Sequence, residues 1–387
     1  MRRFWMAATM ASALLVPQAR GETLNVGLVA TLSGPAAALG VQARDGFNLA
    51  LKQLGGKLGG MDTQVTTVDD ELKPDVAIGR VRTLLERDHV RFVVGPTFSN
   101  VLQAIFKPVT AAKVFLISDN AGPSTFAGKD CSPYFFTTSY QNDQIHEVLG
   151  EYAQSKAYQR IVTIVPNYQA GRDAVAGFKR AFKGDIADEI YVPLGQLDFS
   201  AELARIAAAH PDAVFAFMPG GMGVSLVKQY RQAGLAEKTP FLSAFTVDES
   251  TLPAQQDAAL GMLAGSNYAP TLDTPQNKAF EAAFEAEYHY IPATYAFQAY
   301  DAAMLIDSAV KQLDGKLDDP AATHAALMKA DFKSLRGDFA FNNNGYPIQN
   351  FYLVKVAKRP DGKFQTEIVQ TIFSKFADDY AKDCPLH

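Results

Sequence analysis

The chain has 387 residues, of which 48% are hydrophobic and 20% are charged, and its formal net charge is −5 at pH 7. This is the composition of a globular protein, and a chain of this length favours two domains over one. The acidic balance and the scattered basic residues argue against a nucleic-acid-binding surface, so no nucleic acid is expected among its partners.

The first 21 residues have the pattern of an export signal. Arg2 and Arg3 precede an apolar stretch over residues 4–16, and the small residues Ala19 and Gly21 fit a signal-peptidase site. An N-terminal membrane anchor is the alternative, but the stretch is too short to span a bilayer. We therefore expect cleavage after Gly21 and a mature protein outside the cytoplasm. Removing three arginines from 36 basic and 41 acidic residues would leave a formal charge of −8.

The two cysteines are Cys131 and Cys384. In an exported protein an even pair predicts a disulfide, which would tie the C-terminal end of the chain to the segment "GKDCSPYFF". Two free buried thiols are the alternative. Neither cysteine has a CxxC partner or a neighbouring histidine cluster, so we expect no metal site and no cofactor.

Strand-like and helix-like segments alternate from Thr23 onward. Strands are expected at residues 23–31, 63–71, 90–95 and 114–118, and helices at residues 35–56, 74–88 and 99–113. Short apolar runs between longer helices predict βαβ units and a parallel sheet with right-handed crossovers.

A second set of segments follows with the same rhythm. Helices are expected at residues 143–157, 170–184, 198–210 and 223–235, and strands at residues 160–166, 185–193, 211–218 and 240–245. Two long helices, 274–288 and 294–313, come next, followed by a hairpin over residues 337–357 with a turn rich in Asn and Gly. The expected fold class is α/β, with two doubly wound parallel-sheet lobes.

The sequence contains none of the common catalytic motifs that we searched for. It has no GxSxG elbow, HExxH, P-loop, kinase set or EF-hand loop. No nucleophile–base pair can be assembled from the loop residues, which argues against an enzyme. The six histidines, at positions 89, 146, 210, 289, 324 and 387, show no ligand spacing, and each is expected at the surface or at a helix end.

The segment "RFVVGPTFSN" (residues 91–100) raises the question of a binding site. A buried strand runs into a glycine turn and then a helix, whose first N–H groups are unpaired and lie at the positive end of the helix dipole. Such a place suits an anion. In open α/β sheets ligands bind beyond the carboxyl ends of the strands. The same edge is expected to carry residues 118–124, 166–171, 218–223 and 243–249.

Several segments resemble type I periplasmic solute-binding proteins, the Leu/Ile/Val receptor family of ABC importers. They include "LNVGLVATLSGPAAALGVQARDGFNLALKQLGG", "VDDELKPDVAIGRVRTLLERDHVRFVVGPTFSNV", "VTIVPNYQAGRDAVAGFKRAF" and "TYAFQAYDAAMLI". The resemblance spans the mature chain and implies two lobes joined by three hinge crossovers, near residues 139–141, 267–269 and 341–345. The first lobe would comprise residues 22–139 and 268–343, and the second residues 140–267 and 344–387.

The resemblance also implies a function without catalysis. A monomeric protein would capture a small organic acid in the periplasm and deliver it to an ABC permease in the inner membrane. A sensory module with the same fold is one alternative. An exported α/β hydrolase is another, although it would need the nucleophile elbow that the sequence lacks.

In this family the loops that match residues 97–100 and 118–122 hold the carboxylate of the ligand. Ser99 lies at the matching position, and supporting contacts are expected from Asn100, Asn120, Ala121 and Gly122. The alternative is that Ser99 only caps the helix that follows. Gly220, in the lone GxG of "PGGMGVSL", is expected in a tight turn where the backbone approaches the ligand or the neighbouring lobe.

Phe245 is the position that bears most on the kind of ligand. Relatives that bind α-amino acids usually carry a carboxylate there to pair with the ligand ammonium, and a buried unpaired ammonium is costly. The phenylalanine therefore argues against an amino acid. A slip of three residues in the matching would place Asp248 in that role instead.

Other side chains expected at the cleft also argue against an amino acid. Phe98, Tyr168 and Tyr295 would add three rings to Phe245, and Leu39 would leave space for a flat apolar body. We therefore predict an aromatic carboxylate of the benzoate or phenylpropenoid type.

Overall fold

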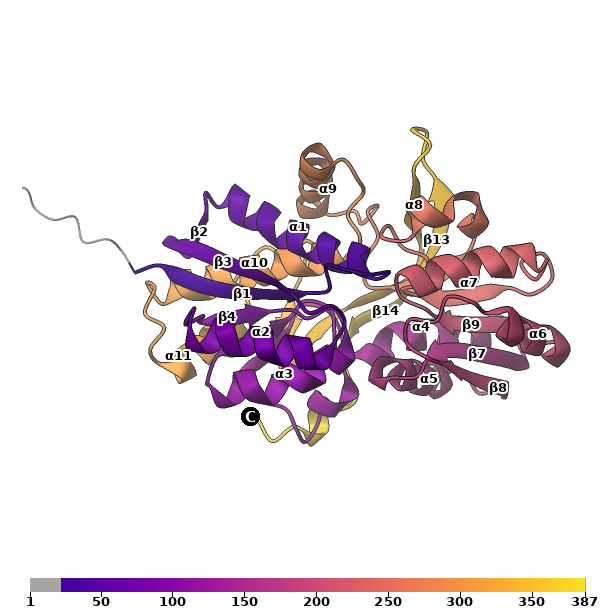
Figure 1. Ribbon diagram of the computed structural model, residues 1–387, viewed down its shortest axis with the longest axis horizontal. Helices are drawn as coiled ribbons and strands as arrows, with labels where there is room; N and C mark the ends of the chain where they lie inside the picture. Colours follow the sequence, from indigo (N-terminus) through magenta and orange to yellow (C-terminus); the bar gives the residue numbers. More distant parts are fainter. Residues whose placement is uncertain (1–21, 387) are drawn as a thin grey trace, which may run out of the picture.

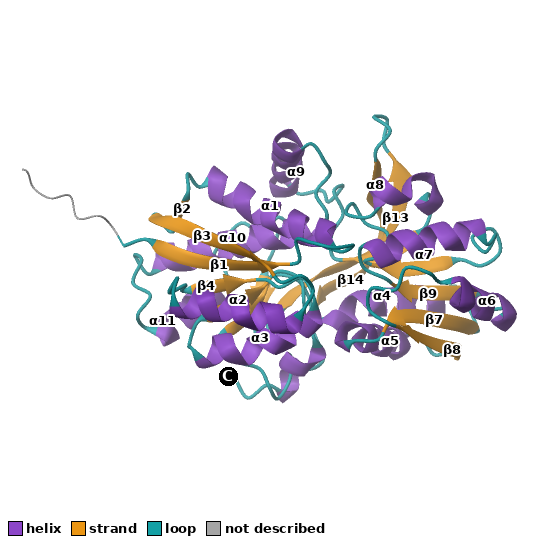
Figure 2. Cartoon of the chain, viewed as in Figure 1, coloured by secondary structure: helices purple, strands orange, loops and turns teal. Residues whose placement is uncertain are grey.

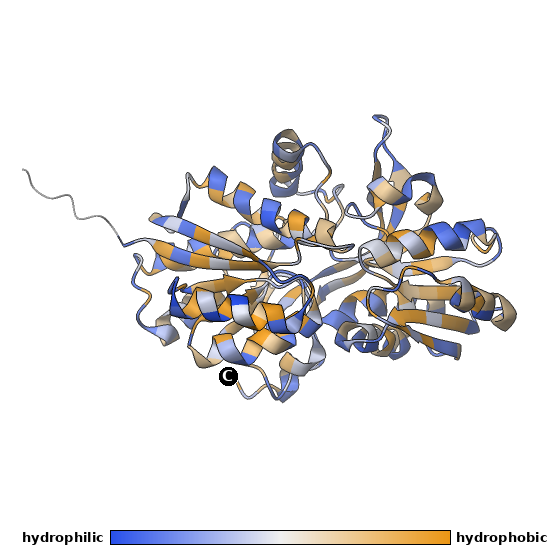
Figure 3. Cartoon of the chain, viewed as in Figure 1, coloured by the Kyte–Doolittle hydropathy of each residue, from blue (hydrophilic) through white to orange (hydrophobic). Residues whose placement is uncertain are grey.

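The computed structural model describes residues 22–386, which form two α/β lobes (Figures 1 and 2). The predicted export signal over residues 1–21 lies outside the described residues. The strands of both lobes are largely apolar, and the helices around them alternate polar and apolar stripes (Figure 3). Among residues 22–386, none of the helices combines the length and the apolar character that a membrane crossing requires.

The first lobe is built on a six-stranded sheet with the order β2-β3-β1-β4-β5-β6. The strands are β1 (Leu24–Ala30), β2 (Lys57–Leu58), β3 (Met61–Asp69), β4 (Phe92–Val94), β5 (Phe115–Ser118) and β6 (Phe135–Thr137). All neighbouring pairs are parallel except β2 with β3. Every residue of β4, β5 and β6 is buried, as in a parallel sheet with both faces covered by helices.

Helices from two distant parts of the chain cover this sheet. They are α1 (Ala37–Gln53), α2 (Pro74–Glu86), α3 (Ser99–Ala111), α9 (Pro275–Tyr288), α10 (Thr294–Gln312) and α11 (Pro320–Lys329), with the short η1 (Ser124–Phe126). The late helix α10 packs along α1. The first lobe is therefore completed only after the chain has formed most of the second.

The second lobe contains an eight-stranded sheet with the order β12-β13-β11-β10-β9-β7-β8, and β14 pairs with β13. Its strands are β7 (Arg160–Pro166), β8 (Asp185–Val192), β9 (Ala213–Phe217), β10 (Phe241–Ala244), β11 (Leu263–Ser266), β12 (Ala340–Phe341), β13 (Pro347–Lys358) and β14 (Phe364–Phe376). Its helices are α4 (Asn142–Ser155), α5 (Gln169–Ala181), α6 (Ser200–Ala209), α7 (Gly221–Gln232) and α8 (Leu252–Gln255), with η2 (Gln256–Ala259). Strands β7 to β11 pair in parallel, whereas β13 and β14 form a long antiparallel hairpin.

The helix that opens the second lobe begins at a well-defined cap. In α4 the side chain of Gln141 accepts a hydrogen bond from the Asp143 N–H, and the side chain of Gln144 accepts one from the Gln141 N–H. This reciprocal capping box satisfies N–H groups that a helix start otherwise leaves unpaired. It fixes the first turn of α4 directly after the crossover from β6.

Three connections join the lobes, as predicted. They follow β6 (residues 138–141), β11 (residues 267–274) and α11 (residues 330–346), and the last of them includes the two residues of β12, which pair with the start of β13. The hairpin expected over residues 337–357 differs in the structure, because β12 has only two residues and the long partner of β13 is β14. Strand β14 was not predicted from the sequence.

The C-terminal tail departs from the predicted division into lobes. The family resemblance implies that residues 344–387 belong to the second lobe, but the segment after β14 returns to the first lobe (Figure 1). The predicted disulfide between Cys131 and Cys384 is present and joins residues 253 positions apart. This covalent bond holds the tail, including η3 (Ala381–Asp383), against the first lobe.

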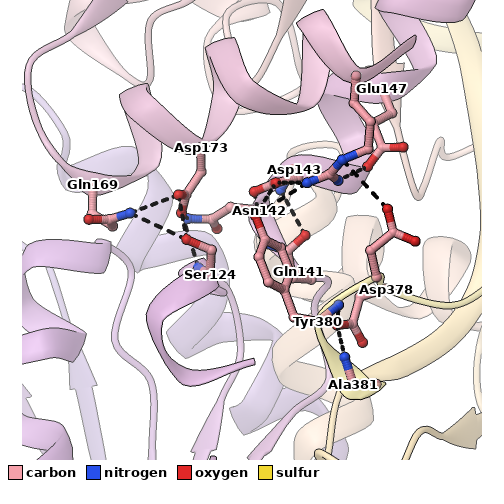
Figure 4. A network of polar contacts seen from close by, with 12 residues as sticks. Ser124, Gln141, Asn142, Asp143, Glu147, Gln169, Asp173, Asp378, Tyr380 and Ala381 are labelled. Atoms are coloured by element: carbon pink, nitrogen blue, oxygen red, sulfur yellow. Dashed lines mark hydrogen bonds and ion pairs between the residues drawn. The ribbon is translucent and has the colours of Figure 1, made fainter. Parts of the chain in front are cut away.

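The tail also contacts the second lobe. The hydroxyl of Tyr380 donates to the carboxylate of Asp143 in α4, at 2.8 Å. Arg180 of α5 donates to the same carboxylate at 2.7 Å and to Glu147 at 2.6 Å (Figure 4). The tail is therefore a fourth link between the lobes, attached covalently on one side and by polar contacts on the other.

Candidate ligand-binding site

A narrow cavity lies where strand ends of the two sheets face each other. It measures about 20 Å³, so a bound molecule needs the lobes to part slightly or side chains to turn. Its lining comes from both lobes: Leu39, Thr97, Phe98, Ser99, Asn120, Ala121, Tyr140, Asn142, His146, Tyr168, Ala170, Phe217, Pro219, Phe245 and Tyr295. The elements β4, β5, β7, β9 and β10 all end beside it.

One end of the cavity is polar and belongs mainly to the first lobe. Ser99 is the first residue of α3, and its hydroxyl oxygen accepts a hydrogen bond from Asn142 Nδ2 at 3.2 Å. Asn120 Nδ2 donates to the backbone oxygen of Thr97 at 2.6 Å, and the hydroxyl of Tyr140 donates to Asn120 Oδ1 at 2.9 Å. These bonds fix the amide of Asn120 on the loop that follows β5.

Ser99 does not act as the cap of α3. The capping position belongs to Phe98, and no side chain caps this helix. The N–H groups of Val101 and Leu102 donate to the Phe98 oxygen, whereas those of Ser99 and Asn100 come before the first helical bonds. The start of α3 therefore presents N–H groups and one hydroxyl at the positive end of the helix dipole.

The remaining walls are aromatic. The rings of Tyr140 and Phe245 stack with centroids 5.2 Å apart, and those of Tyr168 and Phe217 stack at 6.2 Å. Phe98 lies 6.4 Å from Tyr168 across the two lobes, and Tyr295 lies 6.2 Å from Phe245. Rings at these spacings contact one another, and together they form aromatic walls that favour a flat apolar body by stacked or edge-on contacts.

Phe245, rather than Asp248, lines the cavity. Its φ of 53° lies in the left-handed region, which is strained for a bulky side chain. Asp248 Oδ1 instead accepts hydrogen bonds from the N–H and hydroxyl of Ser250, and burial raises the pKa of this carboxyl. Glu249 is likewise turned away, because it accepts hydrogen bonds from the N–H and hydroxyl of Thr366 at 2.7 Å each.

Three of the predicted site residues do not line the cavity. The Gly122 N–H donates to Asn142 Oδ1 at 3.0 Å, so Gly122 positions a lining residue. Gly220 has a φ of 62° and faces the other lobe, where a Cβ would lie 3.1 Å from the Cα of Ala36. Asn100, on the first turn of α3, has a buried Oδ1 with no hydrogen-bond partner among residues 22–386.

Seven further lining residues were not named individually from the sequence. Tyr140, Asn142 and His146 lie at the first crossover and on α4, outside every predicted cleft loop. Thr97, Ala170, Phe217 and Pro219 lie in, or directly before, strand-end loops that were predicted at the cleft. The expectation that every histidine lies at the surface or a helix end is wrong for His146, which is 2% exposed on the second turn of α4. Its position could have indicated a place at the cleft, because His146 lies one helical turn after the crossover, on the side of α4 that faces the cleft.

The lobes touch on either side of the cavity. On one side, Asp173 of α5 accepts hydrogen bonds from the N–H of Ser124 at 3.2 Å and from its hydroxyl at 2.7 Å (Figure 4). Asn142 Nδ2 donates both to Asp173, at 2.9 Å, and to Ser99. On the other side, the Gly221 N–H donates to the Pro35 oxygen at 3.0 Å. Asn142 thus connects the polar end of the cavity to one of the contacts between lobes.

A family model described as periplasmic binding protein matches residues 23–363. The chain belongs to the periplasmic binding protein family. The predicted family and fold are therefore confirmed, and proteins of this family bind solutes rather than catalyse reactions.

Solved structures similar to this periplasmic binding protein include an ABC transporter solute-binding protein from R. palustris in complex with benzoate. It is 32% identical, with a TM-score of 0.89, over 94% of this chain and 100% of the other. Another, from Rhodopseudomonas palustris BisB5 with 3,4-dihydroxybenzoic acid, is 30% identical, with a TM-score of 0.85, over 92% and 99%. The Leu/Ile/Val-binding protein homolog 6 of Brucella melitensis is 29% identical over 98% of both chains.

Together these relatives show that the periplasmic binding protein described here is the solute-binding component of an ABC transporter. Within residues 22–386 no cluster of three His, Cys, Asp or Glu side chains could hold a metal ion. The side chains that line the cleft offer hydrogen bonds and aromatic contacts.

One buried acid beside the site is expected to make stability depend on pH. Asp119 is 1% exposed, its Oδ2 has no hydrogen-bond partner among the described residues, and burial raises its pKa to about 7. The folded chain therefore keeps a proton that the unfolded chain loses above about pH 4. The contribution of the protonated Asp119 carboxyl to the free energy of unfolding is therefore present at low pH. We expect it to be lost as the pH rises through 7, which lowers the free energy of unfolding by roughly 2–4 kcal/mol.

Thermal melting between pH 5 and pH 8 tests this expectation. The melting temperature of the natural protein should fall as the pH rises, and Asp119→Asn should fall less because its amide does not titrate. Asp130→Asn, which changes an exposed acid of the same lobe, should follow the natural protein. Parallel melting curves for the natural protein and Asp119→Asn would contradict the assignment.

Proposed function

We propose that this protein captures an aromatic carboxylate between its lobes and delivers it to an ABC permease in the inner membrane. One observation carries the proposal: the same cavity is lined by hydrogen-bond donors around Ser99 and by aromatic side chains from both lobes. A benzoate-like molecule has the same division, with charge at one end and a flat apolar body.

The polar end is suited to the carboxylate. The first N–H groups of α3 and the hydroxyl of Ser99 can donate hydrogen bonds to it, and the positive end of the helix dipole favours the negative charge. Asn142, which now donates to Ser99, supports the orientation of that hydroxyl from the second lobe. A ligand held by both residues would bridge the lobes and favour their approach.

The aromatic part disfavours an α-amino acid. Within residues 22–386 the cavity lining includes no Asp or Glu that could pair with an ammonium group; Glu249 is bonded to Thr366, and Asp248 is held through Oδ1 by Ser250. An ammonium group buried without a partner would lose its hydration at high cost. The Brucella relative is named for leucine, isoleucine and valine, so branched-chain amino acids are the competing ligands to test.

The ligands of similar solved structures support an aromatic acid. Benzoate and 3,4-dihydroxybenzoic acid occupy proteins that share at least 30% of their residues with this chain over nearly its whole length. Amino acids would be favoured instead if the carboxylate of Asp248 faced the cavity, and it does not line it.

A thermal-shift screen followed by calorimetric titration tests the proposed function. At a hundredfold excess over its dissociation constant, a true ligand should add about 2.7 kcal/mol to the stability of the folded protein. We expect this from benzoate-type or phenylpropenoid acids and not from leucine, isoleucine or valine. Tight binding of leucine without binding of any aromatic acid would overturn the proposal.

Replacing Ser99 by alanine is expected to weaken binding of the aromatic acid by about ten- to a hundredfold. The substitution removes one hydrogen bond to a charged group, which contributes about 1.5–3 kcal/mol. Calorimetric titration measures the change. Ser308→Ala, which alters a serine on α10 that bonds only to its own helix, should bind like the natural protein. Unchanged affinity in Ser99→Ala would remove Ser99 from the site.

A further inference from the structure

His146 is a buried polar side chain that the proposed carboxylate contacts leave unused. It lines the cavity, it is 2% exposed, and its Nδ1 has no hydrogen-bond partner within residues 22–386. Buried polar groups in folded proteins are nearly always paired, so an unpaired one requires an explanation. Burial lowers the pKa of the imidazole to about 3, so the ring is neutral under all ordinary conditions.

Three aromatic rings pack around the imidazole of His146. Its ring centroid lies 5.6 Å from that of Phe215, 5.2 Å from Phe217 and 6.3 Å from Phe245. Phe215 and Phe217 come from β9, and Phe245 follows β10. Because these neighbours are hydrocarbon rings, the direction left for a polar partner is the cavity itself.

The position of His146 along α4 sets what could reach it. Asn142, which bonds to Ser99, precedes His146 by four residues, so both lie on the same face of the helix, one turn apart. One turn rises about 5.4 Å. Both side chains line the same cavity, with Asn142 beside Ser99 and His146 one turn farther along the helix. A ring whose carboxylate lies at Ser99 would therefore direct its far edge toward His146.

We propose that His146 determines specificity by hydrogen bonding to a hydroxyl on the far edge of the bound ring, at position 3 or 4 relative to the carboxylate. The ligand class is then a hydroxylated benzoate rather than benzoate itself. This inference rests on the proposed function and deepens it. A neutral imidazole carries one donor and one acceptor nitrogen, and a phenolic hydroxyl can pair with either.

The same geometry argues against other substituents on the far edge. A second carboxylate would meet a neutral ring and three hydrocarbon rings, with no positive charge to balance it. A methyl group would leave the imidazole unpaired, as benzoate does. We therefore expect the site to bind a ring with a hydroxyl on its far edge more tightly than a ring with a charged or a purely apolar group there.

Calorimetric titrations of the natural protein and of His146→Leu test the proposal. The probes are benzoate, 3-hydroxybenzoate, 4-hydroxybenzoate and terephthalate. In the natural protein at least one of the two hydroxybenzoates should bind about tenfold more tightly than benzoate, and terephthalate should bind most weakly. His146→Leu should bind benzoate within threefold of the natural protein, and its preference for the hydroxybenzoate should disappear.

Two further variants separate recognition from packing. His146→Gln keeps a donor and an acceptor and should restore part of the preference that leucine removes. His324→Leu alters a histidine on α11 in the first lobe, away from the cavity, and should keep the full preference. Melting temperatures of all variants show whether each one folds.

The outcomes distinguish this inference from the proposed function. If benzoate and both hydroxybenzoates bind the natural protein equally, or if His146→Leu keeps the preference, the role of His146 is refuted while the aromatic-acid function stands. If no aromatic acid binds the natural protein, both proposals are wrong.

Discussion

Replacing Arg336 by methionine is expected to lower the free energy of unfolding by about 3–5 kcal/mol. The Arg336 side chain is 4% exposed, and it lies 3.2 Å from the fully buried carboxylate of Asp301 in α10. It also donates to the Thr138 oxygen in the first crossover at 2.6 Å and to Gln349 in β13. Methionine would leave the Asp301 charge buried without a cation and the Thr138 oxygen without this donor, and the side chain of Gln349 would lose one of its hydrogen bonds.

Urea denaturation followed by circular dichroism measures this loss. Lys333→Met, which removes an exposed cation three residues earlier, should stay within about 0.5 kcal/mol of the natural protein. Adding Asp301→Leu to Arg336→Met should recover part of the stability, because the unpaired charge is then gone. A single variant Arg336→Met as stable as the natural protein would show that the buried pair contributes nothing.

Replacing Asp173 by asparagine is expected to weaken binding of the aromatic acid by about ten- to a hundredfold, while changing the stability of the ligand-free protein little. The Asp173 carboxylate accepts hydrogen bonds from the N–H and hydroxyl of Ser124, which lies on the opposite lobe. These two bonds exist only while the lobes are in contact, so they favour the closed arrangement that holds a ligand. Bonds to a charged acceptor contribute about 1.5–3 kcal/mol each.

Calorimetric titration with the acid that binds best, together with thermal melting of the free protein, checks this expectation. Asp185→Asn, on the exposed start of β8, is the matched control and should leave affinity unchanged. Ser124→Ala should weaken binding in the same direction, and the double variant should lose less than the sum of the single losses. Full affinity in Asp173→Asn would show that this contact does not contribute to closure.

Much of the fold follows from the alternation of apolar runs and amphipathic helices. Strands such as β4 and β5 are continuous apolar segments bounded by turn residues and helix starts. The apolar run and the residues that bound it both predict a strand at these positions. Strand β14 was missed because most of its side chains are exposed or only partly buried, which weakens the alternation on which a strand prediction depends. The pairing of the cysteines was predictable, but the side of the molecule on which the tail lies was not.

The site shows the same contrast between local and tertiary information. Ser99, Tyr168 and Phe245 follow strands directly, so the rule that ligands bind at strand ends locates them. Asn142 and His146 lie inside a helix, where polar residues are ordinarily expected to face solvent. Only the packing of α4 against the second sheet reveals that this face is buried.

The link between Cys131 and Cys384 closes most of the chain into a covalent ring. A protease that cuts once inside this ring, for example at the exposed turn between β13 and β14, leaves a nicked molecule whose fragments stay attached until a reductant is added. The same ring means that both halves of the binding cleft would be recovered together after such a cut. Limited digestion would therefore change the migration of the protein only on a reducing gel.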